Sequence, residues 1–427
     1  MASANGMPRM PVPGGSHWLL LLSCFIGYAT LNRGFAYIGV YPFFIGEFAL
    51  LFYLLSIRHL QLLPRFLSSP AGMTWAIFLS YNLVLFLISA QTNLEESLRH
   101  SIFWVYSIFF YIGYAYGTCL ALRNQVERFQ SFMLWCSKAT VVYFALFPFK
   151  DSLRVLTGFL YNDTALVGYY STLHAIALGL VLFFLFDRRV ALREVWVAIG
   201  LILIIGISQA RASMLAMFFI TLYMVAFSST AALKRSAVKT VAVIAFLALL
   251  FSLGEIGLSG ERGEMSSDFF GKAIESIFFG SDVDTLDGSR RDRLLWWADV
   301  IGRTTNTLGT TFFGMGYDVI LLDRASTENT IIRFPHNSFL SVFGFSGATG
   351  LLLYLALVSL VIHKIFRASR RSDAFALIRW YPIFSIGYFV SAFFSTVFEA
   401  PFHSYVFWVI SGVVYGIVSS NGRPRTC

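Results

Sequence analysis

Apolar segments about as long as a lipid bilayer is thick recur along the whole chain, and they constrain its fold more than any other feature. A membrane-spanning helix needs roughly 20 apolar residues, with a range of about 17–25. Hydrophobic residues make up 57% of the 427 residues and charged residues only 13%. A soluble domain of this composition could not cover its core with polar surface. The sequence therefore predicts an all-α polytopic integral membrane protein.

We predict about twelve transmembrane helices from the lengths of these segments. One hydrophilic stretch, residues 257–335, separates the ninth helix from the tenth and forms a large loop. The chain then divides into helices 1–9 (residues 1–256), this loop (residues 257–335) and helices 10–12 (residues 336–427). The predicted spans are residues 18–32, 36–57, 71–90, 101–121, 131–149, 165–186, 191–208, 210–228, 237–256, 338–362, 377–396 and 403–420.

The basic residues are concentrated in alternate loops. If the N-terminus is cytoplasmic, lysines and arginines far outnumber acidic residues in the loops on the same side. This bias orients membrane proteins, so we expect both termini in the cytoplasm and the large loop outside a bacterial inner membrane, facing the periplasm. The net charge of +9 is then a topology signal and does not indicate a nucleic-acid partner.

His336 stands at the boundary between the large loop and the tenth predicted span. Pro335 precedes it and disfavours helix in the residue before the proline. The imidazole is thus expected at the outer lipid boundary. Histidine has an ordinary pKa near 6.5 and can act as a general base at neutral pH. The alternative is a structural role, because a lone histidine at a helix start is more often a cap or a hydrogen-bond donor.

Arg211 lies between two apolar runs with almost no loop to spare. A cation in this position must extend to the lipid boundary, pair with a carboxylate or bind an anion.

A second cationic group lies in the large loop. Residues 287–303 have the pattern of an amphipathic helix in the membrane interface, with Ser289 and Asp292 placed as a capping box. The start of such a helix would combine free backbone N–H groups with three arginines, an arrangement that suits phosphate oxygens. The alternative is a solvated basic end. The three arginines are Arg290, Arg291 and Arg293.

Other polar residues in or near apolar segments are candidates for supporting roles, because ionisable groups there are usually paired or functional. They are Glu47, Arg333, Asn337, Glu399 and His403. Neither zinc-binding cysteine spacing nor a metal or nucleotide-binding motif supports a metal site, and we expect no cofactor.

Four stretches resemble motifs of the bacterial O-antigen ligase and polymerase family of membrane glycosyltransferases. "PHNSFLSVFGFSGATG" is similar to the family's H-[NSQ]-x9-G-x-x-G signature, with His336, Asn337, Gly347 and Gly350 at its fixed positions. "EAPFHSYVFW" is similar to a late acidic motif in many members.

The other two stretches carry arginines. "SQARASMLA" resembles the family's "SR" turn and places that arginine on Arg211, although residues are inserted after Ser208. "RLLWWADVI" resembles an arginine-plus-tryptophan helix and places the second arginine on Arg293. The neighbouring arginines leave the exact assignment open.

The resemblance implies a metal-independent, inverting transfer of a glycan from undecaprenyl pyrophosphate to a sugar hydroxyl. His336 would be the base, and Arg211, Arg293 and Arg290 would bind the pyrophosphate. The acceptor would be lipid A core in a ligase, or another lipid-linked glycan in a polymerase, with a weak preference for the polymerase; a protein hydroxyl is also open. The alternatives are a transporter or flippase of lipid-linked glycans, and a membrane acyltransferase that uses His336.

Overall fold

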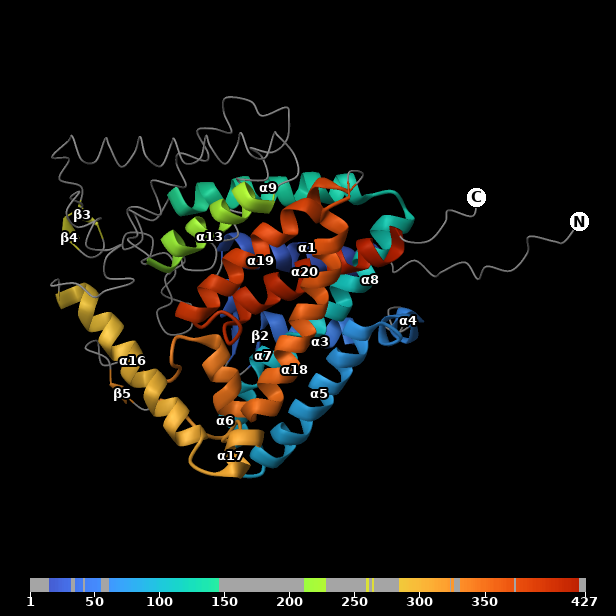
Figure 1. Cartoon of the computed structure of the whole chain (residues 1–427). Coiled ribbons are helices and arrows are strands. Elements are labelled where there is room, and N and C mark those ends of the chain that lie inside the picture. Colours follow the sequence, from blue (N-terminus) through green and yellow to red (C-terminus); the bar gives the residue numbers. More distant parts are fainter. Residues whose placement is uncertain are drawn as a thin grey trace, which may run out of the picture.

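The structure is a computed structural model of the whole chain (Figure 1). The residues that it describes are 15–31, 35–40, 43–54, 61–145, 211–227, 259–260, 263–264, 284–322, 324–325, 331–371 and 374–421. They are mostly helical, with three short two-stranded antiparallel ladders.

Five helical segments in the described ranges are long and apolar enough to cross a membrane. They confirm the helices that were predicted at 71–90, 101–121, 338–362, 377–396 and 403–420. The segments are α5 (Pro70–Ser89), α7 (Ile102–Val105) with α8 (Ile108–Leu122), α18 (Ser338–Ser369), α19 (Ala376–Phe394) and α20 (Pro401–Asn421).

Two further helices coincide with predicted spans. Helix α9 (Val126–Ala145) covers most of the span predicted at 131–149, and α13 (Arg211–Phe227) covers the span at 210–228. The spans predicted at 165–186, 191–208 and 237–256 lie outside the described residues, so the total of about twelve stays a prediction.

The N-terminal segment departs from the prediction. Helix α1 (Gly15–Ile26) continues into a π-helical turn, Gly27–Leu31, within the first predicted span. The prediction of one helix over 36–57 is wrong, because β1 (Gly39–Val40) pairs with β2 (Phe43–Phe44) and α3 (Ile45–Leu54) begins only after them.

Glu47 explains where α3 begins. Its carboxylate accepts a hydrogen bond from the backbone N–H of Phe44 at 2.9 Å, which satisfies one of the free N–H groups at the helix start. The Tyr106 hydroxyl donates to the same carboxylate at 2.8 Å. Glu47 is therefore paired inside the helix bundle.

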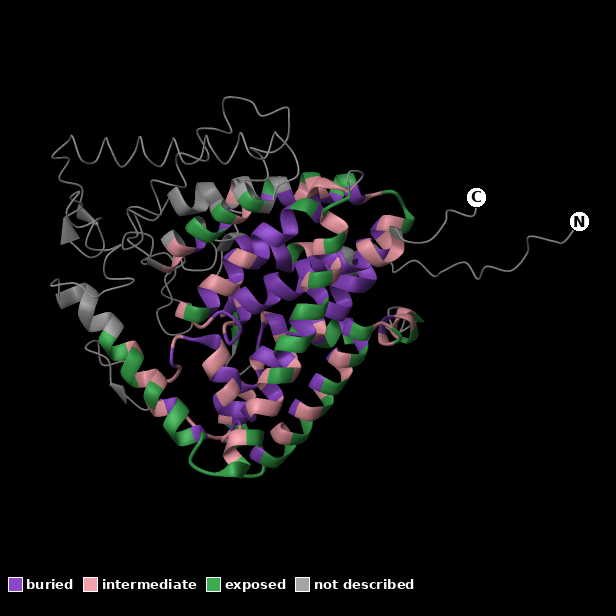
Figure 2. Cartoon of the chain, in the orientation of Figure 1, coloured by how far each residue is buried: buried purple, intermediate pink, exposed green. Residues whose placement is uncertain are grey.

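The core of the bundle depends on the close contact of α8 with α20 (Figure 2). A Cβ atom on Gly117 of α8 would lie 2.0 Å from the carbonyl oxygen of Val413, and one on Gly416 would lie 2.4 Å from that of Tyr114. Glycines spaced four residues apart on both helices allow this approach of the two backbones.

Helix α5 has the opposite character. Many of its large apolar side chains are exposed, whereas Phe78 on its other face is buried against Tyr354 of α18. The exposed side chains are Met73, Ile77, Leu83, Val84, Leu87 and Ile88. Such a surface on a span-length helix is typical of contact with lipid tails.

Short helices that precede and follow the long ones lie at one end of this bundle in Figure 1. They include α6 (Leu94–His100) and α17 (Leu308–Phe313), while α16 (Asp284–Thr304) extends outward from α17. The remaining short elements are α4 (Leu63–Leu67), β3 (Ser259–Gly260), β4 (Gly263–Glu264), β5 (Arg324–Ala325) and β6 (Ile331–Ile332).

Helix α16 confirms a helix over 287–303 but corrects its start. It begins at Asp284, more than a turn before Ser289, so the predicted capping box is wrong. The free N–H groups of a helix are in its first turn. The three arginines lie after that turn, so they are not beside these groups. On α16, Leu294 and Ile301 are exposed while Val300 is buried.

Candidate functional site

Helix α18 is broken at Gly347, where φ is +66°. Three carbonyl groups directly before the break accept hydrogen bonds from other parts of the chain. The backbone N–H of Met315 donates to the carbonyl of Gly344 at 2.8 Å, and that of Gly316 donates to Phe345 at 3.2 Å. The Tyr81 hydroxyl donates to the carbonyl of Ser346 at 2.7 Å.

Gly347 of the predicted signature and Gly314 make room for a turn beside the break. A Cβ atom on Gly347 would lie 2.4 Å from the carbonyl group of Phe312, and one on Gly314 would lie 2.3 Å from the carbonyl oxygen of Phe345. The Gly314–Gly316 turn therefore packs closely against the break in α18 and supplies two backbone N–H groups to its carbonyl groups.

Asn337 is the N-cap of α18. Its side-chain oxygen accepts hydrogen bonds from the backbone N–H groups of Phe339 at 3.1 Å and Leu340 at 3.2 Å. The cap that a helix start needs is thus provided by Asn337. The imidazole of His336 does not serve this purpose.

His336 has a left-handed backbone conformation, with φ of 51°. Among the described residues that are not glycine, only Asn124 shares a positive φ, and asparagine tolerates this region better than histidine does. Such outliers are found at functional sites more often than elsewhere, because the surrounding structure must hold them in place.

Helix α16 supplies the neighbours of His336. The ring of Trp296 lies 5.7 Å from the imidazole, between ring centroids. The indole N–H of Trp297 donates to the carbonyl of Pro335 at 2.8 Å. Burial, and secondarily the positive charge of Arg293, lower the pKa of His336 to about 4. The imidazole is therefore neutral at pH 7, as a general base must be.

The structure brings one of the predicted arginines to His336. Arg293 is half-buried and close enough to act on the imidazole, whereas Arg291 is exposed. Arg211 is the first residue of α13. The side chains of Arg211 and Arg290 lie outside the described part of the chain.

Glu399 is hydrogen-bonded to the first residue of α18, Ser338. The Ser338 hydroxyl donates a short hydrogen bond to its carboxylate. The same hydroxyl accepts from the backbone N–H groups of Val397 at 2.8 Å and Phe398 at 3.1 Å. Burial raises the pKa of Glu399. His403, one turn further along the chain, is also buried.

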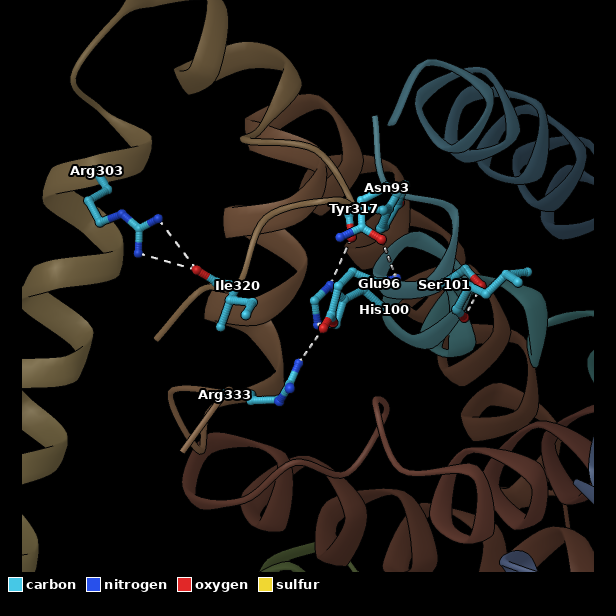
Figure 3. Close-up of polar contacts among 9 residues, drawn as sticks. Asn93, Glu96, His100, Ser101, Arg303, Tyr317, Ile320 and Arg333 are labelled. Atoms are coloured by element: carbon cyan, nitrogen blue, oxygen red, sulfur yellow. Dashed lines mark hydrogen bonds and ion pairs between the residues drawn. The ribbon is translucent and has the colours of Figure 1, made fainter. Parts of the chain in front are cut away.

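A polar cluster that the sequence did not indicate lies beside Arg333 (Figure 3). Arg333 donates to the Glu96 carboxylate at 2.6 Å. His100, one turn after Glu96 on α6, is fully buried and its Nδ1 lies 2.8 Å from the carbonyl oxygen of Tyr317. The signal available in the sequence was the Glu-x-x-x-His spacing in a short polar segment. Residues four apart share a helix face, so this spacing indicates that Glu96 and His100 are neighbours.

A separate cavity of 930 Å³ lies between α5 and the Gly314–Gly316 turn. Apolar side chains of α5 line most of it, and Thr92 and Asp318 lie among its polar lining residues. Neither His336 nor Arg293 lines it, so it is distinct from the candidate site.

Together these features define a helical membrane protein with a histidine–arginine site beside the start of a broken helix. Residues 196–355 match the sequence model of a protein family described as O-antigen ligase. This match supports the family that the motifs predicted, and it spans His336, Asn337 and the arginines of the candidate site. The match supports a membrane enzyme that transfers glycans. A search of curated proteins gives no match.

Proposed function

We propose that the chain transfers a glycan from undecaprenyl pyrophosphate to the hydroxyl group of an acceptor sugar. The observation that carries this proposal is the position of His336 within the matched domain. It is a neutral, mostly buried imidazole in the field of Arg293, at the start of a membrane-spanning helix.

In the proposed reaction, a ring nitrogen of His336 takes the proton of the acceptor hydroxyl. The hydroxyl oxygen forms a bond to the anomeric carbon as the bond from that carbon to the pyrophosphate oxygen breaks. The pyrophosphate leaves with the electron pair, so a single displacement inverts the anomeric centre. The donor is already activated, and the reaction requires neither ATP nor a metal ion.

The leaving pyrophosphate gains negative charge, which arginines stabilise well because a guanidinium forms two parallel hydrogen bonds and stays protonated. Arg293 is proposed for this role from its proximity to His336. Arg211 and Arg290 are proposed from the motifs alone. The same pyrophosphate would offset the effect of Arg293 on His336 and raise the pKa of the imidazole in the donor complex.

The proposed setting is the inner membrane, with both termini in the cytoplasm and the site on the periplasmic side. The acceptor would be lipid A core or another lipid-linked glycan. To test the reaction, the purified protein in proteoliposomes is supplied with undecaprenyl-pyrophosphate-linked glycan and a lipid acceptor fraction from the source cells. The proposal requires release of undecaprenyl pyrophosphate together with a glycosylated product, from donor and added acceptor in a ligase or from the donor alone in a polymerase. Glycan movement across the membrane without release would support a flippase.

A further inference from the structure

The segment Arg333–Asn337 is held in place on both sides of His336. Its N-terminal part is held by Arg333, which pairs with Glu96 at 2.6 Å, and by a hydrogen bond of 3.2 Å from the Leu322 N–H to the Arg333 carbonyl. Pro335 accepts from Trp297, and Asn337 caps α18. These contacts hold the residues on both sides of His336, which itself has the left-handed conformation.

Glu96 is the carboxylate that anchors this segment to the rest of the protein. It lies on α6, 237 positions before Arg333 in the sequence. Both side chains are mostly buried, with 15% and 21% of their surface exposed. Burial alone would raise the pKa of Glu96, but the hydrogen bond and charge of Arg333 prevail and lower it. The carboxylate thus stays ionised at neutral pH and keeps its hold on Arg333.

His100 packs against the aromatic side chains around this segment. A carbonyl can only accept, so Nδ1 carries the ring hydrogen in the bond to Tyr317. Nε2 then has no hydrogen to donate, and it lies 3.5 Å from the Glu96 carboxylate without a hydrogen bond to it. The imidazole stacks on Phe345 at 4.7 Å and meets the edge of Phe334 at 5.6 Å, between ring centroids. His100 therefore contacts Phe334 before His336 and Phe345 in the first half of α18. Figure 3 shows its bond to Tyr317, the residue after the Gly314–Gly316 turn.

We infer that Glu96 and His100 are positioning residues that set the location of the His336 imidazole through Arg333 and Phe334. This inference rests on the proposed function, in which His336 is the base. Small displacements of a catalytic group matter, because an error of about 1 Å can reduce a rate by about 100-fold. Glu96 and Arg333 position the segment Arg333–Asn337, which carries the proposed base, and do not bind the donor themselves. Loss of their pairing should therefore reduce kcat and leave KM for the donor unchanged.

The test is a double-mutant cycle in the proteoliposome assay, with Glu96→Gln, Arg333→Gln and the combined variant. Each single change should reduce kcat by about 10- to 100-fold. The combined variant should be no worse than either, because both changes break the same interaction. Glu96→Asp, which keeps the charge, should recover part of the activity. Glu95→Gln is the matched control, since Glu95 is the exposed neighbour on the same helix.

Several results would overturn the inference. They are wild-type kcat in Glu96→Gln, a combined loss equal to the product of the single losses, and a loss of activity that tracks a loss of thermal stability. A raised KM with normal kcat in Arg333→Gln would make Arg333 a donor-binding residue instead. If His336→Ala retains full activity, the proposed function fails. If His336→Ala is inactive while Glu96→Gln is normal, only the positioning role fails.

Discussion

Arg293 on α16 acts on His336 across the site, where its positive charge adds to burial in lowering the pKa of the imidazole to about 4. The ordinary pKa of histidine is near 6.5. The charge of Arg293 thus affects the protonation of His336. An anion bound between the two residues would change the pKa of the imidazole.

The pH dependence of transfer should show the low pKa of His336. In the free enzyme the imidazole is neutral above its pKa of about 4, so kcat/KM should stay level as pH falls through 6.5 and should decrease only near 4. Bound pyrophosphate favours the protonated imidazole, so the decrease in kcat should occur at higher pH than the decrease in kcat/KM. Both profiles come from initial rates of undecaprenyl pyrophosphate release. A kcat/KM limb at or above pH 6.5 would contradict the assignment.

Replacing Arg293 should raise the pKa of His336. Arg293→Gln removes the charge but keeps the burial, which is the larger cause, so the pKa should rise and remain below 6.5. Nuclear magnetic resonance of histidine-labelled protein in detergent measures the pKa directly, with His336→Asn to assign the signal. Arg291→Gln is the control, because Arg291 is exposed on the same helix. Equal shifts in the two variants would show that Arg293 has no specific effect.

Gly347 should tolerate no side chain. Gly347→Ala combines a positive φ, costing about 1–3 kcal/mol, with a Cβ atom 2.4 Å from the Phe312 carbonyl. Thermal unfolding of the solubilised protein should show a large loss of stability or no folded protein. Gly302→Ala is the matched control, since a Cβ atom there meets nothing within 4 Å and alanine favours helix by about 1 kcal/mol. Equal stability of the two variants would contradict the role of the break in α18.

Ser338 should be important for the start of α18. Ser338→Ala leaves the Glu399 carboxylate and two buried N–H groups without this partner, at about 1–3 kcal/mol for each unsatisfied group. Thermal stability should fall clearly. Ser385→Ala should have little effect, because its hydroxyl bonds to the Tyr381 carbonyl one turn away in the same helix. A Ser338→Ala variant as stable as Ser385→Ala would rule out this connection.

Much of the fold could be predicted from hydropathy alone, because span length and apolar composition determine where α5, α18, α19 and α20 lie. The strands before α3 could not, since the apolar residues near Gly39 resemble those of a helix and the outcome depends on a glycine conformation and on Glu47. Glycines at spacings of four on α8 and α20 were a readable signal for their close contact.

Prediction of the site was limited in a different way. His336 and Arg293 could be selected from motifs that are local in sequence. The spacing of Glu96 and His100 indicated only a shared helix face, because their importance arises when α6 folds against a segment more than 200 residues later. Asn337 could be predicted as a cap from its place before an apolar run, whereas the left-handed conformation of His336 depends on contacts from α6 and α16.

Removal of the imidazole tests the central claim most directly. His336→Ala, assayed for release of undecaprenyl pyrophosphate from its linked glycan, should lose about 100- to 10,000-fold of the rate, as expected for a general base. Membrane insertion should be unchanged. His363→Ala is the matched control, because His363 is an exposed histidine on α18, the helix that follows His336. A His336→Ala enzyme as active as wild type and the control would contradict the account.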